Sequence, residues 1–193
     1  MMKSVLMGAV FTALSVSGAA FAQQAAPEAP GRPEVKTVED WIVRCFPIQS
    51  PSPCDMFQEQ DAKETHQRVL SLSIAYVPSL DRHALQVSVP LDIAIQKGVT
   101  IQTDSYSSPV LRYRRCDRNG CYVEQAVDNA LVEGLAKSSG SGKINVVADN
   151  GRTFPIGFSL KGFAAAHDDM VAQARAKAKA VEKQPAAAPA TKP

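Results

Sequence analysis

Apolar and polar side chains alternate with a period of two along much of this chain. In "LQVSVPL", Leu85, Val87 and Val89 alternate with Gln86 and Ser88. This alternation is typical of a β-strand that buries one face. The run "VLSLSIAYV" alternates in the same way, and either of its two phases could face the core. The pattern therefore predicts strands in the central part of the chain.

A hairpin is predicted further along, in "INVVADNGRTFPIGFSL". Asn150 and Gly151 separate two strand-like runs, and Asn-Gly favours a tight turn because both residues tolerate positive φ. Pro155 cannot donate a backbone hydrogen bond, so we expect the second run at a sheet edge or with its proline nitrogen turned outward. That run places four large apolar residues on one face, namely Phe154, Ile156, Phe158 and Leu160.

The segments "WIVRCF" and "PVLRYRRC" predict further strands, and "NALVEGLAKSS" predicts a short helix. Many short strands without interleaved helices indicate a mainly β fold, an antiparallel sandwich or barrel-like domain. We place this domain at residues 37–168.

The N-terminus has the three parts of a secretory signal peptide: a positive charge at Lys3, a short apolar run and the small-residue site Ala20-Phe21-Ala22. The run is too short and too diluted by polar residues to favour a retained membrane anchor. We expect residues 1–22 to be cleaved and the mature protein to lie in the periplasm or cell envelope. Residues 23–36 form an Ala/Pro-rich leader that we expect to be flexible.

The C-terminal part is rich in alanine and lysine, and it predicts a helix at residues 169–183 appended to the β domain. Asp168 and Asp169 lie near its expected start, where they suit the helix dipole. Residues 184–193 form a Pro/Ala tail that we expect to be disordered.

Composition adds little about function. The chain has 193 residues, of which 45% are apolar, and its formal net charge is only +2. These values suit one globular domain with appendages. Such a small charge does not indicate a nucleic-acid partner.

Four cysteines in an exported chain indicate a disulfide framework with three possible connectivities. Local pairing is favoured. Four residues separate Cys116 from Cys121, and a four-residue hairpin loop would place the two directly opposite each other. Cys45 and Cys54 flank the proline-rich "FPIQSPSP", an irregular loop that a bridge would fix.

The cysteine spacings do not favour metal or redox chemistry. Zinc sites commonly use ligand pairs two residues apart, whereas eight and four residues separate these cysteines. An exported oxidoreductase would carry Cys-x-x-Cys at the start of a helix. Structural disulfides are the favoured interpretation.

The chain lacks a recognisable catalytic motif. Gly-x-Ser-x-Gly is absent, and "SSGSGKIN" lacks the first glycine and the hydroxyl residue of a phosphate loop. His66 and His83 lie in polar, loop-like surroundings, and Trp41 is expected to anchor the core. We therefore assign no catalytic, cofactor-binding or metal-binding residue and predict that the protein is not an enzyme.

One basic cluster is a candidate for partner binding: Arg112, Arg114, Arg115, Arg118 and the neighbouring Tyr122. With Cys116 opposite Cys121, Arg115 would lie opposite Tyr122 and could make a cation–π contact. Alternation sends Arg112 and Arg114 to the other face. The favoured interpretation is a solvated hairpin whose arginines protect a sheet edge, and the alternative is an anion- or partner-binding tip.

Several segments together resemble the invasion-associated locus B (IalB) family. They are "EDWIVRC", Cys54 with Gln58, "VPLDIAIQKGVTIQTD", "CDRNGC" and "SLKGF", which follow one another in the family's order. The resemblance covers about residues 38–168. Two positions depart from it, because Glu39 and Asp92 stand where the family commonly has glycine.

This resemblance implies an exported, disulfide-containing β-rich domain of Gram-negative bacteria, with no accepted catalytic residues to carry over. The founding member is associated with invasion of host red cells, although many relatives occur in bacteria without a host. We therefore expect a non-catalytic protein that binds an envelope protein, a cell-wall component or a host surface, without a cofactor. The alternatives are a periplasmic enzyme of unrecognised type and a stress-related chaperone or inhibitor that uses an exposed sheet edge.

Overall fold

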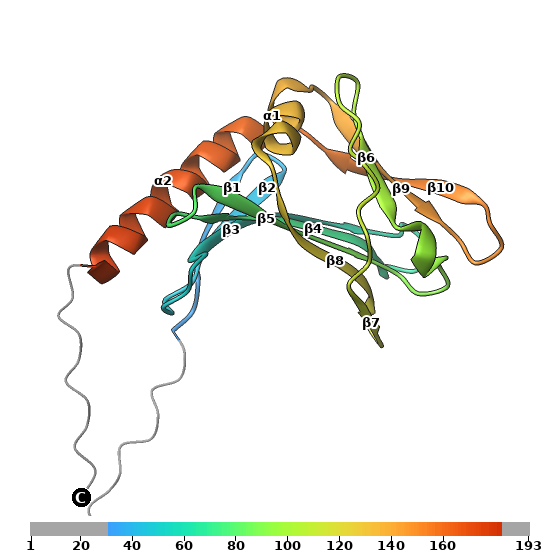
Figure 1. Ribbon diagram of the computed structural model, residues 1–193, viewed down its shortest axis with the longest axis horizontal. Coiled ribbons are helices and arrows are strands. Elements are labelled where there is room, and N and C mark those ends of the chain that lie inside the picture. Colours follow the sequence, from blue (N-terminus) through green and yellow to red (C-terminus); the bar gives the residue numbers. More distant parts are fainter. Residues whose placement is uncertain (1–30, 183–193) are drawn as a thin grey trace, which may run out of the picture.

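The computed structural model describes residues 31–182, which form two antiparallel sheets and two α-helices (Figure 1). The larger sheet has the strand order β1-β2-β3-β4-β5-β8-β7, and the smaller has the order β10-β9-β6. The strands of the larger sheet are β1 (Glu34–Val38), β2 (Trp41–Cys45), β3 (Cys54–Asp61), β4 (Arg68–Val77), β5 (Arg82–Val89), β7 (Arg115–Asp117) and β8 (Gly120–Val127). The other elements are η1 (Ile95–Lys97), β6 (Val99–Gln102), α1 (Asn129–Lys137), β9 (Ser141–Val147), β10 (Thr153–Ser159) and α2 (Phe163–Glu182).

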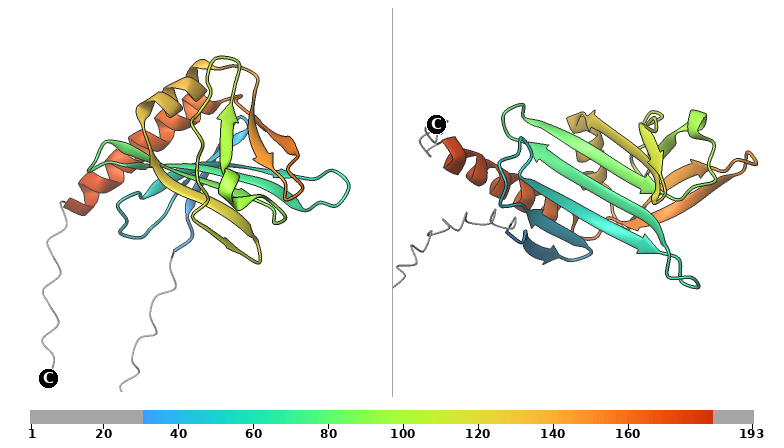
Figure 2. Two further views of the ribbon diagram at one scale, coloured as in Figure 1. Left: turned by 45° about the vertical axis from the view of Figure 1, so that its right-hand side comes forward. Right: turned by 90° about the horizontal axis from the view of Figure 1, so that it is seen from below.

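Within the described residues, only one face of the seven-stranded sheet is covered. Helix α2 crosses β2, β3 and β4 on that face, and the small sheet lies above the other part of the large sheet (Figure 1). Seen from below, the strands of the large sheet lie in front of both covers (Figure 2). The covered face, α2 and the small sheet share one hydrophobic core. We call the uncovered side of the large sheet the open face.

The predicted alternation is confirmed in the strands. In β4 the buried phase contains Leu70, Leu72 and Ile74, which are at most 1% exposed, and in β5 it contains Leu85 and Val87. The mainly β, antiparallel fold that the sequence predicted is therefore correct.

The predicted hairpin at Asn150-Gly151 is also confirmed. Strands β9 and β10 pair antiparallel on either side of it, and Gly151 has a φ of 82° in the turn. Strand β10 is the outer strand of the small sheet, so Pro155 lies at an edge as expected. Phe154 departs from the prediction, since it is 37% exposed near the turn of the hairpin.

The expected short helix forms as α1, and the Asp128 carboxylate caps it by accepting a hydrogen bond from the backbone N–H of Leu131 at 3.1 Å.

The segment "PVLRYRRC" is not a continuous strand, contrary to the prediction. Leu111 exchanges backbone hydrogen bonds with Val99 of the small sheet, whereas the N–H of Arg114 donates to the carbonyl of Tyr122 in the large sheet. The segment therefore crosses from one sheet to the other, and only Arg115–Asp117 joins the ladder as β7.

Helix α2 starts at Phe163, six residues before the predicted start, and it is part of the core instead of an appendage. Its buried side chains recur at spacings of three and four residues, which is the period of a helix face: Phe163, Ala166, Met170 and Ala174, each at most 1% exposed. The alanines let the helix approach the sheet closely. At the start of the helix, the Phe163 ring packs edge-on against Trp41 at 5.2 Å between centroids, and Trp41 is fully buried as expected.

The remaining boundaries are partly outside the described residues. Strand β1 starts at Glu34, inside the leader predicted for 23–36. The predicted signal peptide (1–22) and tail (184–193) lie outside the described residues.

The two departures from the resembled family have a backbone explanation. Glu39 and Asp92 have φ values of 53° and 66°, in the left-handed region that glycine adopts without a steric cost. Glycine is therefore the least strained residue at both positions, and this chain folds with side chains there.

We expect Met170→Ala to lower the free energy of unfolding by about 2–5 kcal/mol, because it removes a buried side chain between α2 and the sheet. Urea denaturation measures this loss. The exposed Lys179→Ala, on the same helix, should change stability by less than about 0.5 kcal/mol. Equal effects of the two variants would contradict the packing of α2 into the core.

Candidate partner-binding surface

The open face has a floor of small side chains between two larger clusters. The floor is formed by alternate residues of the central strands, which point away from the core because side chains alternate along a strand. Ala75, Ala84 and Ala126 occupy one row across β4, β5 and β8, and Ser73 lies in the next row. These residues line a shallow hollow of about 500 Å³.

The first cluster lies at the β2–β3 side of this floor. The Arg44 guanidinium donates from Nε to Oδ1 of Asp55 at 2.9 Å, and its carbon lies 3.6 Å from the centre of the Phe57 ring. The hydroxyl of Ser73 donates to Oδ2 of Asp55 at 2.9 Å. The charged pair is only partly exposed, at 29% and 13% of the two side chains. Arg44 is thus held flat on an aromatic ring by its carboxylate partner.

The second cluster lies at the β7–β8 side, and it also holds an arginine against an aromatic ring. The Arg115 guanidinium lies 3.9 Å above the Tyr122 ring and donates to Asp117 at 2.7 Å and Glu124 at 3.0 Å. Register places Arg115 opposite Tyr122, as predicted from the cysteine pairing. The amide of Gln86 also donates to Glu124 at 3.0 Å.

These contacts keep the cluster charged. Partial burial disfavours ionisation of Glu124, but hydrogen bonds from Arg115 and Gln86 outweigh it and lower the pKa of this carboxyl. The pKa of Asp117 is also lowered, first by the backbone N–H of Asn119 and then by Arg115. The first cluster therefore presents one cation paired with one carboxylate, and the second presents one cation held between two carboxylates.

The predicted basic cluster divides into two kinds of arginine. Arg112 donates to the backbone carbonyl of Gln96 at 2.7 Å, and Arg115 is neutralised as described, so both have structural partners. Arg114 and Arg118 make no side-chain hydrogen bond or ion pair with any residue of 31–182. Arg114 lines the hollow of the open face beside Glu124, which contradicts its predicted placement on the other face. It precedes β7, so the alternation of that strand does not apply to it.

The hairpin that carries Tyr122 is held by the predicted Cys116–Cys121 disulfide. The two cysteines are directly opposite, and the ladder continues to Asp117 and Gly120, so the loop has two residues and not four. Gly120 has a φ of 139°, and a Cβ there would lie 2.3 Å from the carbonyl oxygen of Val89. Only glycine therefore lets the hairpin lie this close to β5.

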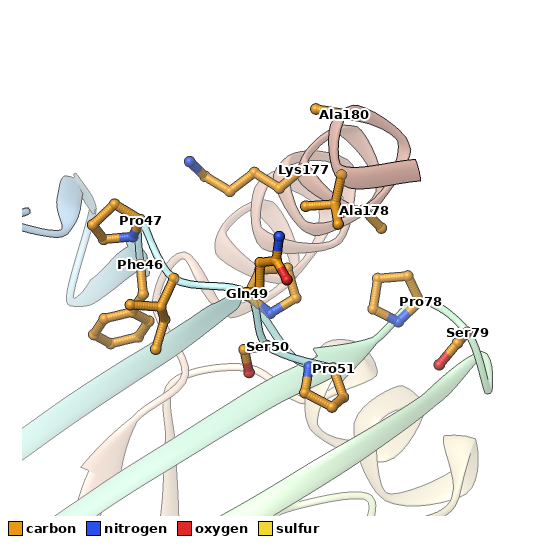
Figure 3. Close-up of a pocket in the computed structure, with 13 residues that line it drawn as sticks. Phe46, Pro47, Gln49, Ser50, Pro51, Pro78, Ser79, Lys177, Ala178 and Ala180 are labelled. Carbon is orange, nitrogen blue, oxygen red and sulfur yellow. The ribbon is translucent and has the colours of Figure 1, made fainter. Parts of the chain in front are cut away.

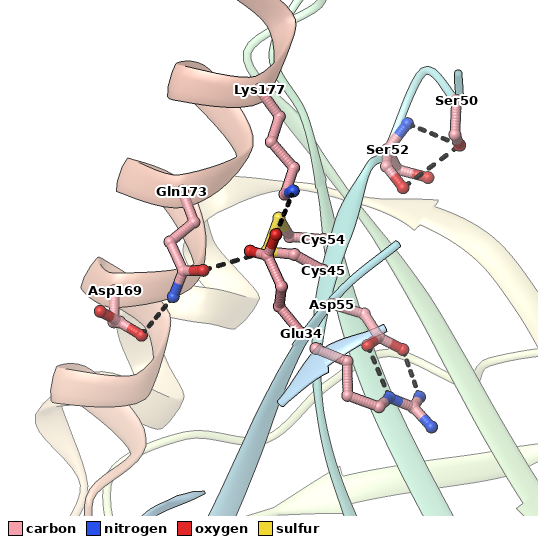
Figure 4. Close-up of a disulfide and its surroundings, with 10 residues drawn as sticks. Glu34, Cys45, Ser50, Ser52, Cys54, Asp55, Asp169, Gln173 and Lys177 are labelled. Carbon is pink, nitrogen blue, oxygen red and sulfur yellow. Dashed lines mark hydrogen bonds and ion pairs between the residues drawn. A yellow bond between two sulfur atoms is a disulfide. The ribbon is translucent and has the colours of Figure 1, made fainter. Parts of the chain in front are cut away.

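The predicted Cys45–Cys54 disulfide is also present and joins β2 to β3 (Figure 4). Beside it, Nζ of Lys177 pairs with Glu34 at 3.2 Å, and Gln173 of α2 donates to Asp169 at 2.7 Å. The disulfide is thus enclosed between the sheet and α2, a position that suits a structural role.

A second hollow, of about 560 Å³, lies between the loop closed by this disulfide, the β4–β5 turn and the end of α2 (Figure 3). Its walls are mainly proline, alanine and other apolar residues, including Phe46, Ile48 and Val181. Lys177 is its one ionisable side chain within the described part of the chain. Gln49, Ser50 and Ser79 are its other polar lining residues.

Two histidines that are far apart in the sequence lie together in the structure. His83 lies in β5 and is 6% exposed, so its predicted loop-like surroundings were wrong. Its Nε2 lies 2.9 Å from Nε2 of His167 on α2. Residues 31–182 contain no group of three or more His, Cys, Asp or Glu side chains placed to hold a metal ion.

Sequence reasoning missed Arg44, Asp55, Phe57, Gln86 and Glu124, which complete the open face. Their signal is weak, because each is only the polar or partly exposed position of an alternating strand. The strand order β5-β8 brings Gln86 beside Glu124 although they are 38 positions apart in the sequence.

The protein is therefore a mainly antiparallel β domain with an open polar face and two local disulfides. The model of the family described as Invasion associated locus B (IalB) protein matches residues 41–171. The chain belongs to this family, which is not a known enzyme family.

Two curated relatives are Invasion protein B homologs of Brucella abortus, from strain 2308 and from biovar 1 strain 9-941. Each is 28% identical over 166 residues, which cover 86% of this chain and 94% of the relative. The crystal structure of invasion associated protein B from Bartonella henselae has a TM-score of 0.63 at 21% identity, covering 72% of this chain and 97% of that one. It therefore has the same fold. No helix within residues 31–182 is long and apolar enough to cross a membrane.

We expect the double variant Arg114→Glu/Arg118→Glu to change the free energy of unfolding by less than about 0.5 kcal/mol, because neither side chain has a partner within residues 31–182. Arg44→Glu should cost about 1–3 kcal/mol, since it leaves the partly buried Asp55 without its cation. Chemical denaturation compares the variants. A large loss in the double variant would identify these two arginines as structural.

Proposed function

We propose that this protein is exported, performs no chemistry and binds a partner at the envelope or cell surface through its open face and the β7–β8 hairpin. The partner would be an envelope protein, a cell-wall component or a host surface. One observation carries the proposal: the open face displays charged and polar groups that are already fixed by contacts with one another.

Fixed side chains favour binding because association then costs less conformational entropy. Arginine and tyrosine are also enriched in protein interfaces. The unpaired Arg114 and Arg118 add donors at one end of the face that a partner can use. The two guanidinium groups cover the Phe57 and Tyr122 rings, so a sugar cannot stack on these covered faces, which favours a protein partner over a glycan.

Photo-crosslinking in intact cells tests the surface. A photoreactive residue in place of Ala84 or Ala126, in the floor of the open face, should give a discrete adduct with a partner. The same residue at Ala172, exposed on α2, should not. Adding Arg114→Glu/Arg118→Glu should weaken the adduct at least several-fold, because it reverses the two unpaired charges.

A matched control reverses two exposed charges away from the open face, Arg152→Glu and Lys179→Glu, and should leave the adduct unchanged. Equal adducts from the open face and from Ala172 would contradict the proposed surface. Absence of an adduct at Ala84 and Ala126 under conditions where Ala172 captures a partner would place binding elsewhere.

Export has its own test. When the full chain is expressed, we expect the mature protein in the periplasmic or envelope fraction. Its first residue should be Gln23, because the small-residue cleavage site precedes it. Deletion of residues 2–22 should leave the protein in the cytoplasm with reduced cysteines. Export of the deleted chain, or a mature N-terminus that still includes residues 1–22, would contradict the proposal.

A further inference from the structure

The contact between His83 and His167 joins strand β5 of the large sheet to helix α2. His83 lies on the covered face of β5, and His167 lies in the second turn of α2. Their Nε2 atoms are 2.9 Å apart, within hydrogen-bond distance. The rings are enclosed by aromatic neighbours, with Tyr76 at 5.2 Å from His83 and Phe163 stacked at 6.4 Å from His167.

The hydrogen-bond network assigns the protons of the neutral pair. Nδ1 of His167 lies 3.3 Å from the carboxylate of Asp168, so this nitrogen carries a proton and donates it. Nε2 of His167 is then an acceptor, and Nε2 of His83 is the donor between the rings. This leaves Nδ1 of His83 as the free lone pair, and this atom is buried without a hydrogen-bond partner.

Both routes to a charged pair are unfavourable. A proton added to Nδ1 of His83 places a positive charge on a buried ring, and Asn129 and Asp81 offset this cost only in part. A second proton would place two Nε2–H groups head to head at 2.9 Å, with two like charges. The two rings therefore stay in close contact only while both are neutral.

Charged and polar groups from each packed element lie around the pair. From the β4–β5 side come Tyr76 and Asp81, from α1 come Asn129 and Glu133, and from α2 come Asp168 and Arg175. Burial and then the proximity of His167 lower the pKa of His83, while Asn129 and Asp81 oppose them in part. Arg175 is occupied by hydrogen bonds to Tyr76 at 2.8 Å and Asp81 at 3.1 Å, and it adds a further positive charge.

We propose that His83 and His167 form a proton-sensitive contact that holds α2 on the seven-stranded sheet at neutral pH and loosens it in mildly acidic solution. The sign follows from linkage. A group whose pKa is lower in the folded state than in the unfolded chain stabilises the fold above its unfolded pKa, about 6.5 for histidine. That stabilisation is lost as the pH falls through the folded pKa.

Hydrogen exchange of the full chain tests the contact. Between about pH 7.5 and about pH 5.5, the exchange of α2 amides, corrected for intrinsic rates, should accelerate several-fold relative to β3 and β4 amides. In His167→Gln, whose substituted side chain is only 19% exposed, this pH dependence should be largely lost. The exposed His66→Gln, which removes the third histidine, should retain it.

An imidazole NMR titration of the wild-type chain provides a measurement that does not depend on a variant. It should show His83 taking up its proton below the usual pKa of a histidine side chain, because the ring is buried. Equal pH dependence of α2 exchange in His167→Gln and the wild type would overturn the proposal, as would protonation of His83 at or above the usual histidine pKa. These outcomes are separate from partner capture by the open face.

Discussion

The apolar face of the seven-stranded sheet is the constraint on which the rest of the structure depends. A sheet this wide buries its hydrophobic face only if another layer covers it. Two elements cover it here. Helix α2 lies across β2, β3 and β4, and the small sheet lies above the other part of the large sheet (Figure 1). Both contribute to one core. The C-terminal helix is therefore integral to the fold, because its buried side chains belong to the same core as the sheet.

Because one side of the large sheet is apolar and covered, the polar positions of its strands lie on the other side. The open face carries alternating polar residues, and its two arginine–aromatic clusters are tied by carboxylates instead of being buried. The two disulfides join β2 to β3 and β7 to β8, close to the two edges of the sheet. On the chain-entropy model, each short loop that they close contributes about 2–3 kcal/mol. The disulfides thus fix the strands near both edges, while the face between them stays uncovered within residues 31–182.

Local patterns predicted most strands, the β9–β10 hairpin, α1 and both disulfides, because alternation, Asn-Gly and cysteine spacing act over a few residues. What escaped prediction depends on distant contacts. The buried stripe of α2 consists largely of alanine, so its sequence resembles a solvated helix. His83 and His167 are 84 residues apart, and no local signal joins them. The crossing of "PVLRYRRC" between two sheets, and hence the place of Arg114, follows only from the topology.

Side-chain footprinting by hydroxyl radicals, with purified protein and with intact cells, tests most directly whether the open face is the binding surface. Phe57 and Tyr122 report on its two clusters, and Leu80, 67% exposed in the β4–β5 turn, is the reference. The account predicts that Phe57 and Tyr122 react in the purified protein and become protected in cells, while Leu80 reacts equally in both. Unchanged reactivity of Phe57 and Tyr122 in cells, with protection of Leu80 instead, would contradict it.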